Sequence, residues 1–156
     1  MIILFYFELF LFGFLGLVLG SFCTAIYYRE SIGQPWWSLS KQDKYYKSLC
    51  PSCEHMLGFK DLMPVFSYLI QKGKCRYCGA PIARRYFLIE LFCLFLSIVV
   101  YFVMGMKVIS FFFVFSIPFG VSYILLGVLK AIFPSKLLLI SGGLLLIGVV
   151  LQVTLL

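Results

Sequence analysis

Hydrophobic positions dominate the chain in four long stretches. Uncharged or nearly uncharged runs occupy residues 9–28, 86–106, 108–129 and 137–156, and Glu90 is the one charged residue within them. Each run has about 20 residues, which lets a helix rising 1.5 Å per residue cross about 30 Å of hydrocarbon. The pattern predicts an all-α membrane protein with four transmembrane helices. We divide it into a first span (1–28), a loop (29–85) and three further spans (86–156).

Composition supports this interpretation. Hydrophobic residues make up 63% of the 156 positions, charged residues make up 12%, and the mean hydropathy is +1.06. Soluble domains have about 45–50% apolar and about 25% charged residues. One small core cannot bury such an excess of apolar side chains, so membrane lipid must solvate much of it.

Basic residues predict the orientation of the spans. The net charge is +7, and ten basic residues lie between Arg29 and Arg85. Such a patch can bind nucleic acid, but beside long apolar spans the positive-inside bias explains it better. With loop 29–85 in the cytoplasm, twelve basic residues lie inside and Lys107 alone lies outside. Both termini are then outside, and no nucleic-acid partner is expected.

The first span is expected to remain as an anchor and not to be a cleaved signal peptide. It lacks a basic start, carries Glu8, and its apolar stretch is too long. Gly13, Gly16 and Gly20 recur on one helical face, where small residues permit close helix packing in lipid. The alternative is that this face meets only lipid.

Two Cys-x-x-Cys pairs carry the clearest chemistry of the loop. Cys50 and Cys53 form the first pair, and Cys75 and Cys78 form the second. Zinc prefers four tetrahedral ligands, and two such turns can supply four thiolates. Gly79 follows the second pair, where a tight turn favours a residue free to adopt positive φ. The spacing predicts a zinc-ribbon-like loop whose structural metal supplies folding energy that a small core cannot.

Three other interpretations of the cysteines remain open. Two disulfides require an oxidising compartment, which a cytoplasmic loop does not offer. A redox-active pair is normally single and lies at a strand-to-helix turn. His55 could also replace one sulfur ligand. Cys23 and Cys93 lie within apolar spans and are interpreted as small buried hydrophobic residues.

Further motifs around the loop resemble a known family. The chain is similar to the N-terminal region of the bacterial type IV prepilin leader peptidases over residues 13 to about 95. The motifs that carry the resemblance are Gly20-Ser21-Phe22 with Tyr28-Arg29, Cys50-Pro51, Asp61, Pro64-Val65 with Ser67-Tyr68-Leu69, Gly73 through Ile82, Arg85-Tyr86 and Glu90-Leu91.

The resemblance implies an inner-membrane protein that acts on prepilins or on pseudopilins of type II secretion. Members of the family are aspartic peptidases, and many also methylate the new N-terminal amine with S-adenosylmethionine. Their cleavage depends on two aspartates in the later membrane region, one of them within a Gly-x-Gly-Asp motif. This sequence has no carboxylate side chain after Glu90 and no such motif.

The remaining acids do not replace that pair. An aspartic peptidase needs two carboxylates close enough to share a proton. Glu8 and Glu90 are predicted to lie about 24 Å apart along the membrane normal, from the helical rise. Asp43 and Asp61 lie on the loop, away from the family's catalytic positions. No catalytic residue is assigned, and the chain is not expected to cleave prepilins by itself.

Within the spans, Glu8 is expected to reach water at the outer interface. Glu90 is expected to pair with Arg84 or Arg85 and fix how the loop meets the membrane.

Three hypotheses follow for the function. The chain can be the N-terminal part of a prepilin peptidase that works with a separate chain carrying the aspartates. It can be a residual N-methyltransferase half, although no glycine-rich S-adenosylmethionine motif supports this. It can also be a non-enzymatic adaptor that binds pilin precursors.

Overall fold

Four long helices make up most of the chain in a computed structural model that describes residues 2–37 and 47–154. They are α1 (Ile2–Ser31), α3 (Arg84–Met104), α4 (Val108–Lys130) and α5 (Ser135–Thr154). All four are long and apolar enough to cross a membrane. The predicted all-α architecture is confirmed: the described residues contain four such helices and no extended strand.

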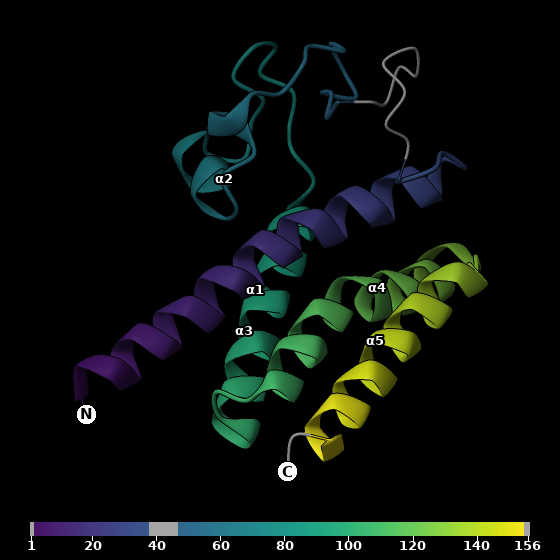
Figure 1. The fold of residues 1–156 in the computed structure, drawn as a ribbon. Coiled ribbons are helices and arrows are strands. Elements are labelled where there is room, and N and C mark those ends of the chain that lie inside the picture. The colour runs from purple at the N-terminus through teal and green to yellow at the C-terminus, as the bar shows by residue number, and fades with distance from the viewer. Residues whose placement is uncertain (1, 38–46, 155–156) are drawn as a thin grey trace.

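The helices form a bundle in which α1 packs along α3 and also contacts α4, while α4 packs along α5. Figure 1 shows the loop between α1 and α3 at one end of this bundle, with the start of α1 and the end of α5 toward the other end. An even number of spans gives this arrangement, because both chain ends then lie on the same side.

Small residues bring α1 and α3 close together. A Cβ atom added at Gly16 would lie 2.7 Å from the Ser97 Cβ, and one added at Gly20 would lie 2.9 Å from the Glu90 Cα. The hydroxyl of Ser97 donates a hydrogen bond of 2.7 Å to the Phe12 carbonyl across the same contact. The predicted packing face on the first span is therefore confirmed.

A small buried core joins three of the helices. Cys23 of α1, Cys93 of α3 and Val121 of α4 share one cluster, and the Cys23 sulfur lies 3.2 Å from the Ser122 hydroxyl. Cys23 and Cys93 are fully buried, as expected for small hydrophobic residues. Many other apolar side chains on the spans are exposed, which suits a lipid environment.

The loop contains little regular structure. A 3-10 turn, η2 (Phe59–Asp61), and a short helix, α2 (Phe66–Ile70), lie between the two cysteine pairs. Each pair is closed by one isolated antiparallel bridge, Leu49 with Met56 and Lys74 with Pro81. Residues 38–46, which include Asp43, lie outside the described part of the chain.

Candidate metal centre and the cavity beside it

The four loop cysteines converge on one point. Their sulfur atoms all lie within 4.8 Å of one another, and the Cys50 and Cys78 sulfurs are 3.9 Å apart. Four ligands on a tetrahedron with metal–sulfur bonds of about 2.3 Å would be separated by about 3.8 Å. The cluster therefore has the composition and the size of a four-thiolate metal site.

Both cysteine pairs adopt the same hairpin-like turn. The Cys50 carbonyl accepts a hydrogen bond from the Glu54 N–H, and the Cys75 carbonyl accepts one from the Gly79 N–H, both at 2.9 Å. Gly79 has φ +72°, as predicted, and Glu54 takes the matching position with φ +57°. A side chain at positive φ is unfavourable, so the first turn is the more strained of the two.

Hydrogen bonding separates the acidities of the thiols. Burial opposes ionisation of Cys50, but backbone N–H groups of Cys53 and Ser52 and neighbouring thiols outweigh it and lower its pKa to about 7. The N–H of Ala80 acts to lower the pKa of Cys78, but burial and the other three thiols raise it to about 11. Thiols this close to one another lose their protons in coupled steps that belong to the cluster as a whole.

Asp61 connects the segments around the cluster. Its carboxylate accepts hydrogen bonds from the Gln71 amide, the Tyr77 hydroxyl and the Gly58 N–H, at 3.1–3.2 Å, and lies 3.5 Å from the Arg76 guanidinium. The hydrogen bond to Asp61, together with burial, raises the pKa of Tyr77. Asp61 thus holds several segments of the loop together, a role that the sequence pattern did not indicate.

His55 does not take the role of a ligand in this geometry. Its ring stacks on the Tyr77 ring with centroids 3.6 Å apart, which joins the first cysteine turn to the second. The four sulfurs alone form the described cluster. All six cysteines of the chain are free thiols in the structure.

Glu90 ties the loop to the membrane helices, but not through the predicted arginine. Its carboxylate accepts a 2.7 Å hydrogen bond from the Val65 N–H. The Arg85 guanidinium instead lies over the Tyr27 and Tyr86 rings, 5.7 and 5.5 Å from their centroids. The predicted ion pair with Arg84 or Arg85 was wrong: Glu90 has no ion pair within the described residues, and aromatic rings near the helix start compete for Arg85. The predicted fixing of the loop by Glu90 is correct.

The segment that Glu90 holds is strained. Val65 has φ +62° and ψ −51°, and the Phe66 N–H bonds back to the Pro64 carbonyl at 2.6 Å. These values describe a γ-turn of the rare positive-φ form. A β-branched residue in this region costs about 1–3 kcal/mol and persists where surrounding contacts impose it. The bond from Val65 to Glu90 is one such contact.

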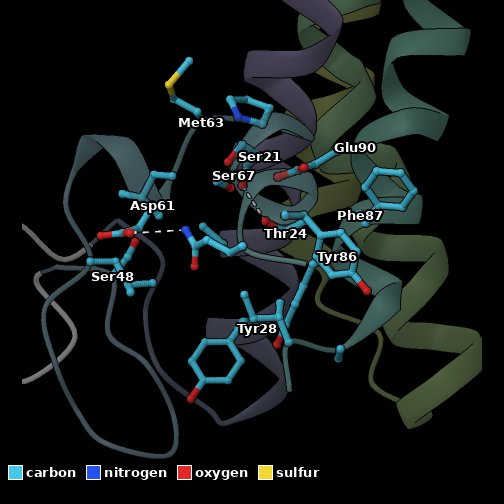
Figure 2. Close-up of a pocket in the computed structure, with 18 of the residues that line it drawn as sticks. Ser21, Thr24, Tyr28, Ser48, Asp61, Met63, Ser67, Tyr86, Phe87 and Glu90 are labelled. Atoms are coloured by element: carbon cyan, nitrogen blue, oxygen red, sulfur yellow. Dashed lines mark hydrogen bonds between the residues drawn. The ribbon is translucent and has the colours of Figure 1, made fainter. Parts of the chain in front are cut away.

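A cavity of about 760 Å³ separates the loop from α1 and α3. Figure 2 shows Ser21 and Thr24 of α1 and Glu90 of α3 on the helix side, with Asp61 on the loop side. The walls are mostly apolar, and the cavity also reaches Cys50 and Cys75. This cavity could not be predicted from the sequence, because its two walls are far apart along the chain.

Glu8 and Glu90 lie too far apart to act as a carboxylate pair. Glu8 accepts a 3.0 Å hydrogen bond from the Tyr101 hydroxyl. Tyr101 follows Glu90 by eleven positions on α3, or about 16 Å at 1.5 Å per residue. Glu8 therefore has a side-chain partner within the bundle, whereas the sequence analysis predicted only contact with water.

Comparison with known proteins gives a consistent result. A sequence model of the bacterial peptidase A24 N-terminal domain matches residues 14–104. A prepilin leader peptidase/N-methyltransferase of Vibrio cholerae is 33% identical over 138 residues, which cover 85% of this chain and 51% of the relative. Proteins of the same description from Burkholderia pseudomallei and Myxococcus xanthus are 37% and 39% identical, over 49% and 54% of this chain and 31% and 23% of their own lengths.

The chain thus spans about half the length of the Vibrio cholerae relative and smaller shares of the other two. No solved structure matches it significantly. The matched residues 14–104 include both cysteine pairs, the cavity wall on α1, and Glu90.

Proposed function

This chain belongs to the family of the bacterial peptidase A24 N-terminal domain, and from this membership we propose that it acts in the processing of type IV pilins or type II secretion pseudopilins. The family match over residues 14–104 carries the proposal, because it contains the whole four-cysteine loop and the two helices that the loop joins. The name of its relatives, prepilin leader peptidase/N-methyltransferase, supports prepilins as substrates.

In this proposal the chain is a multi-pass protein of the bacterial inner membrane with loop 29–85 in the cytoplasm. Twelve of its thirteen basic residues would then lie on the cytoplasmic side, as the positive-inside bias favours. A reducing compartment would keep the loop thiols available as ligands.

Zinc is the metal that best suits the loop. Cys50, Cys53, Cys75 and Cys78 would hold it as four thiolates, which is the ligand set of structural zinc sites. The ion would supply folding energy to a loop with little regular structure and no large core of its own. Its role would be structural, because four protein ligands leave no open position for a reaction.

The residues of this chain do not by themselves provide an aspartic peptidase centre in our proposal. Beyond Glu90 the sequence has no carboxylate side chain, and Glu90 and Glu8 bond to different partners in different parts of the bundle. Cleavage would need a separate chain that carries the two aspartates. Without that partner, the chain would act as an adaptor that binds pilin precursors.

A second candidate function is methyl transfer to the amine of a processed pilin. The cavity between the metal loop and the helices favours it, because it offers a partly open, mostly apolar space of about 760 Å³ at the end of the bundle that carries the loop. The relatives' name includes an N-methyltransferase activity. S-adenosylmethionine would be the methyl donor, as the family resemblance implies.

The test uses bacterial membranes that lack other prepilin peptidases. The chain is expressed with a prepilin, alone or with a second chain that carries the two aspartates. We expect the prepilin to copurify with the chain, to remain uncut when the chain is alone, and to be cut when the second chain is present. Transfer of a radioactive methyl group to a pre-cleaved pilin tests the second candidate.

Treatment with a chelator tests whether prepilin binding depends on the metal. Removal of zinc should reduce copurification of the prepilin, because the loop would lose its main fold-stabilising contact. Cleavage by the chain alone would overturn the assignment of catalysis to a partner. Absence of any prepilin binding, with or without chelator, would overturn the proposed function as a whole.

A further inference from the structure

Glu90 presents an uncompensated carboxylate to the cavity. One oxygen accepts the Val65 N–H at 2.7 Å, and the Ser21 side chain lies within hydrogen-bonding reach. Within the described part of the chain, no lysine, arginine or histidine forms an ion pair with it. The side chain is half-buried and lies about two turns into α3. A carboxylate removed from water without a cationic partner is costly, so this position favours binding of a cation.

The basic residue on the cavity wall, Arg85, does not act as the cationic partner of Glu90. Arg85 lies five positions before Glu90, and its guanidinium is placed over the faces of Tyr27 and Tyr86. Cation–π contacts stabilise the arginine where it stands. The charge of Glu90 is thus left for a ligand.

The cavity walls around the Glu90 carboxylate indicate what is attached to the cation. They are mostly apolar and include Leu17, Val18 and Phe22 of α1 and Met63 of the loop. The cavity is partly open and extends along α1 from the loop end of the bundle toward its middle. Asp61, the other acid on the cavity wall, is already paired with Arg76. One unpaired acid in such a space suits a cation that is attached to an apolar body. A soluble polyamine or a metal ion would leave the apolar walls unfilled.

We propose that Glu90 binds the free N-terminal ammonium of a processed pilin or pseudopilin, and that the first apolar side chains of that segment fill the cavity along α1. This inference rests on the proposed function and names the residue that would hold the product of leader cleavage. An amine at the membrane face could also come from the headgroup of phosphatidylethanolamine. The pilin segment is our assignment, and the experiment separates the two sources.

The experiment measures peptide binding to the full chain with zinc bound, in nanodiscs made of phosphatidylglycerol alone. The probe is a synthetic 14-residue peptide that copies the start of a mature pilin and has a fluorescent label at its C-terminus. It is compared with the same peptide acetylated at its N-terminus. We expect the free-amine peptide to bind at least about tenfold more tightly, as a charge-assisted hydrogen bond predicts.

Glu90→Gln should abolish this preference, because the neutral amide keeps an acceptor for the Val65 N–H but loses the charge. Glu90→Asp should retain part of it and guards against a folding defect, and unchanged zinc content shows that the loop is intact. Glu8→Gln is the matched control: it removes the other carboxylate within a span and should keep the full preference.

Equal binding of the free and acetylated peptides would overturn the inference and leave the proposed function intact, provided that the prepilin still copurifies. Loss of the preference in nanodiscs that contain phosphatidylethanolamine would assign the site to lipid and overturn the pilin assignment. Retention of the preference in Glu90→Gln would also overturn it.

Discussion

At the scale of single residues, Asp61 shows how a loop with little core keeps one conformation. Four groups from different parts of the loop converge on its carboxylate, whose side chain is only 4% exposed. Hydrogen bonds to a charged acceptor are stronger than those to a neutral one. Asp61 therefore complements the metal centre, since it holds the segment between the two cysteine turns.

Asp61→Ala should weaken the metal site without touching a ligand. Loss of the charged acceptor leaves its donors unpaired and costs about 1.5–3 kcal/mol. Zinc should then leave at least about tenfold faster in excess chelator, because the loop opens more often. The rate is measured with a colorimetric zinc indicator. The exposed Lys60→Ala is the control and should release zinc at the wild-type rate. Equal rates for both variants would show that Asp61 does not support the site.

Individual residues also mark the limit of sequence reasoning. The four cysteine ligands could be predicted, because each pair is local and two pairs suffice for one tetrahedral ion. The partner of Glu90 could not be predicted. It is the backbone N–H of Val65 in a γ-turn, and no sequence pattern indicates that Val65 has a positive φ. Arg85 was misassigned for a related reason. A helix start offers several nearby partners, and here the Tyr27 ring, from another helix, is one that Arg85 contacts.

At the scale of helices, close contact between α1 and α3 sets the position of the loop that joins them. The glycines on α1 could be recognised from their spacing, but their partners on α3 could not. Glycine also allows a helix to pack near backbone atoms, and the Cβ that Gly16 lacks would lie 3.0 Å from the Cys93 carbonyl oxygen. The glycines of α5 have a different spacing and are less informative: Gly148 packs on Phe112, whereas Gly142 has open space around it.

Gly16→Ala should therefore destabilise the chain, whereas Gly142→Ala should not. A methyl group at Gly16 overlaps the Ser97 Cβ at 2.7 Å and should cost about 1–3 kcal/mol as the helices move apart. The same group at Gly142 meets nothing within 4 Å and should be neutral or slightly stabilising, because alanine favours helix. Melting temperatures of the purified chain in detergent measure both. A drop for Gly142→Ala as large as for Gly16→Ala would contradict this packing.

At the scale of the whole molecule, the end of the bundle that carries the loop also carries most of the interfacial anchors. Arg84 begins α3, Lys130 ends α4, and the Lys136 ammonium lies 4.4 Å from the centroid of the Trp37 ring. Basic residues concentrate on the cytoplasmic side of the membrane, and tryptophan is enriched at both membrane interfaces. Of the basic residues that the structure describes, Lys107 alone lies at the opposite end, between α3 and α4. The number of spans and the charge asymmetry could both be predicted from the sequence, because each depends on composition along the chain and not on tertiary contacts.

This asymmetry predicts which thiols an impermeant reagent reaches. A cysteine introduced by Lys107→Cys should react with a membrane-impermeant maleimide in intact spheroplasts, because residue 107 is exposed and would face outward. The control, Lys130→Cys, is equally exposed but should react only in inverted membrane vesicles. The wild-type chain gives the background, and its loop thiols should stay unlabelled in spheroplasts. If Lys107→Cys is labelled only in inverted vesicles, the four-cysteine loop faces the oxidising side. A reduced metal site and a cytoplasmic cavity for a processed pilin would then both be wrong.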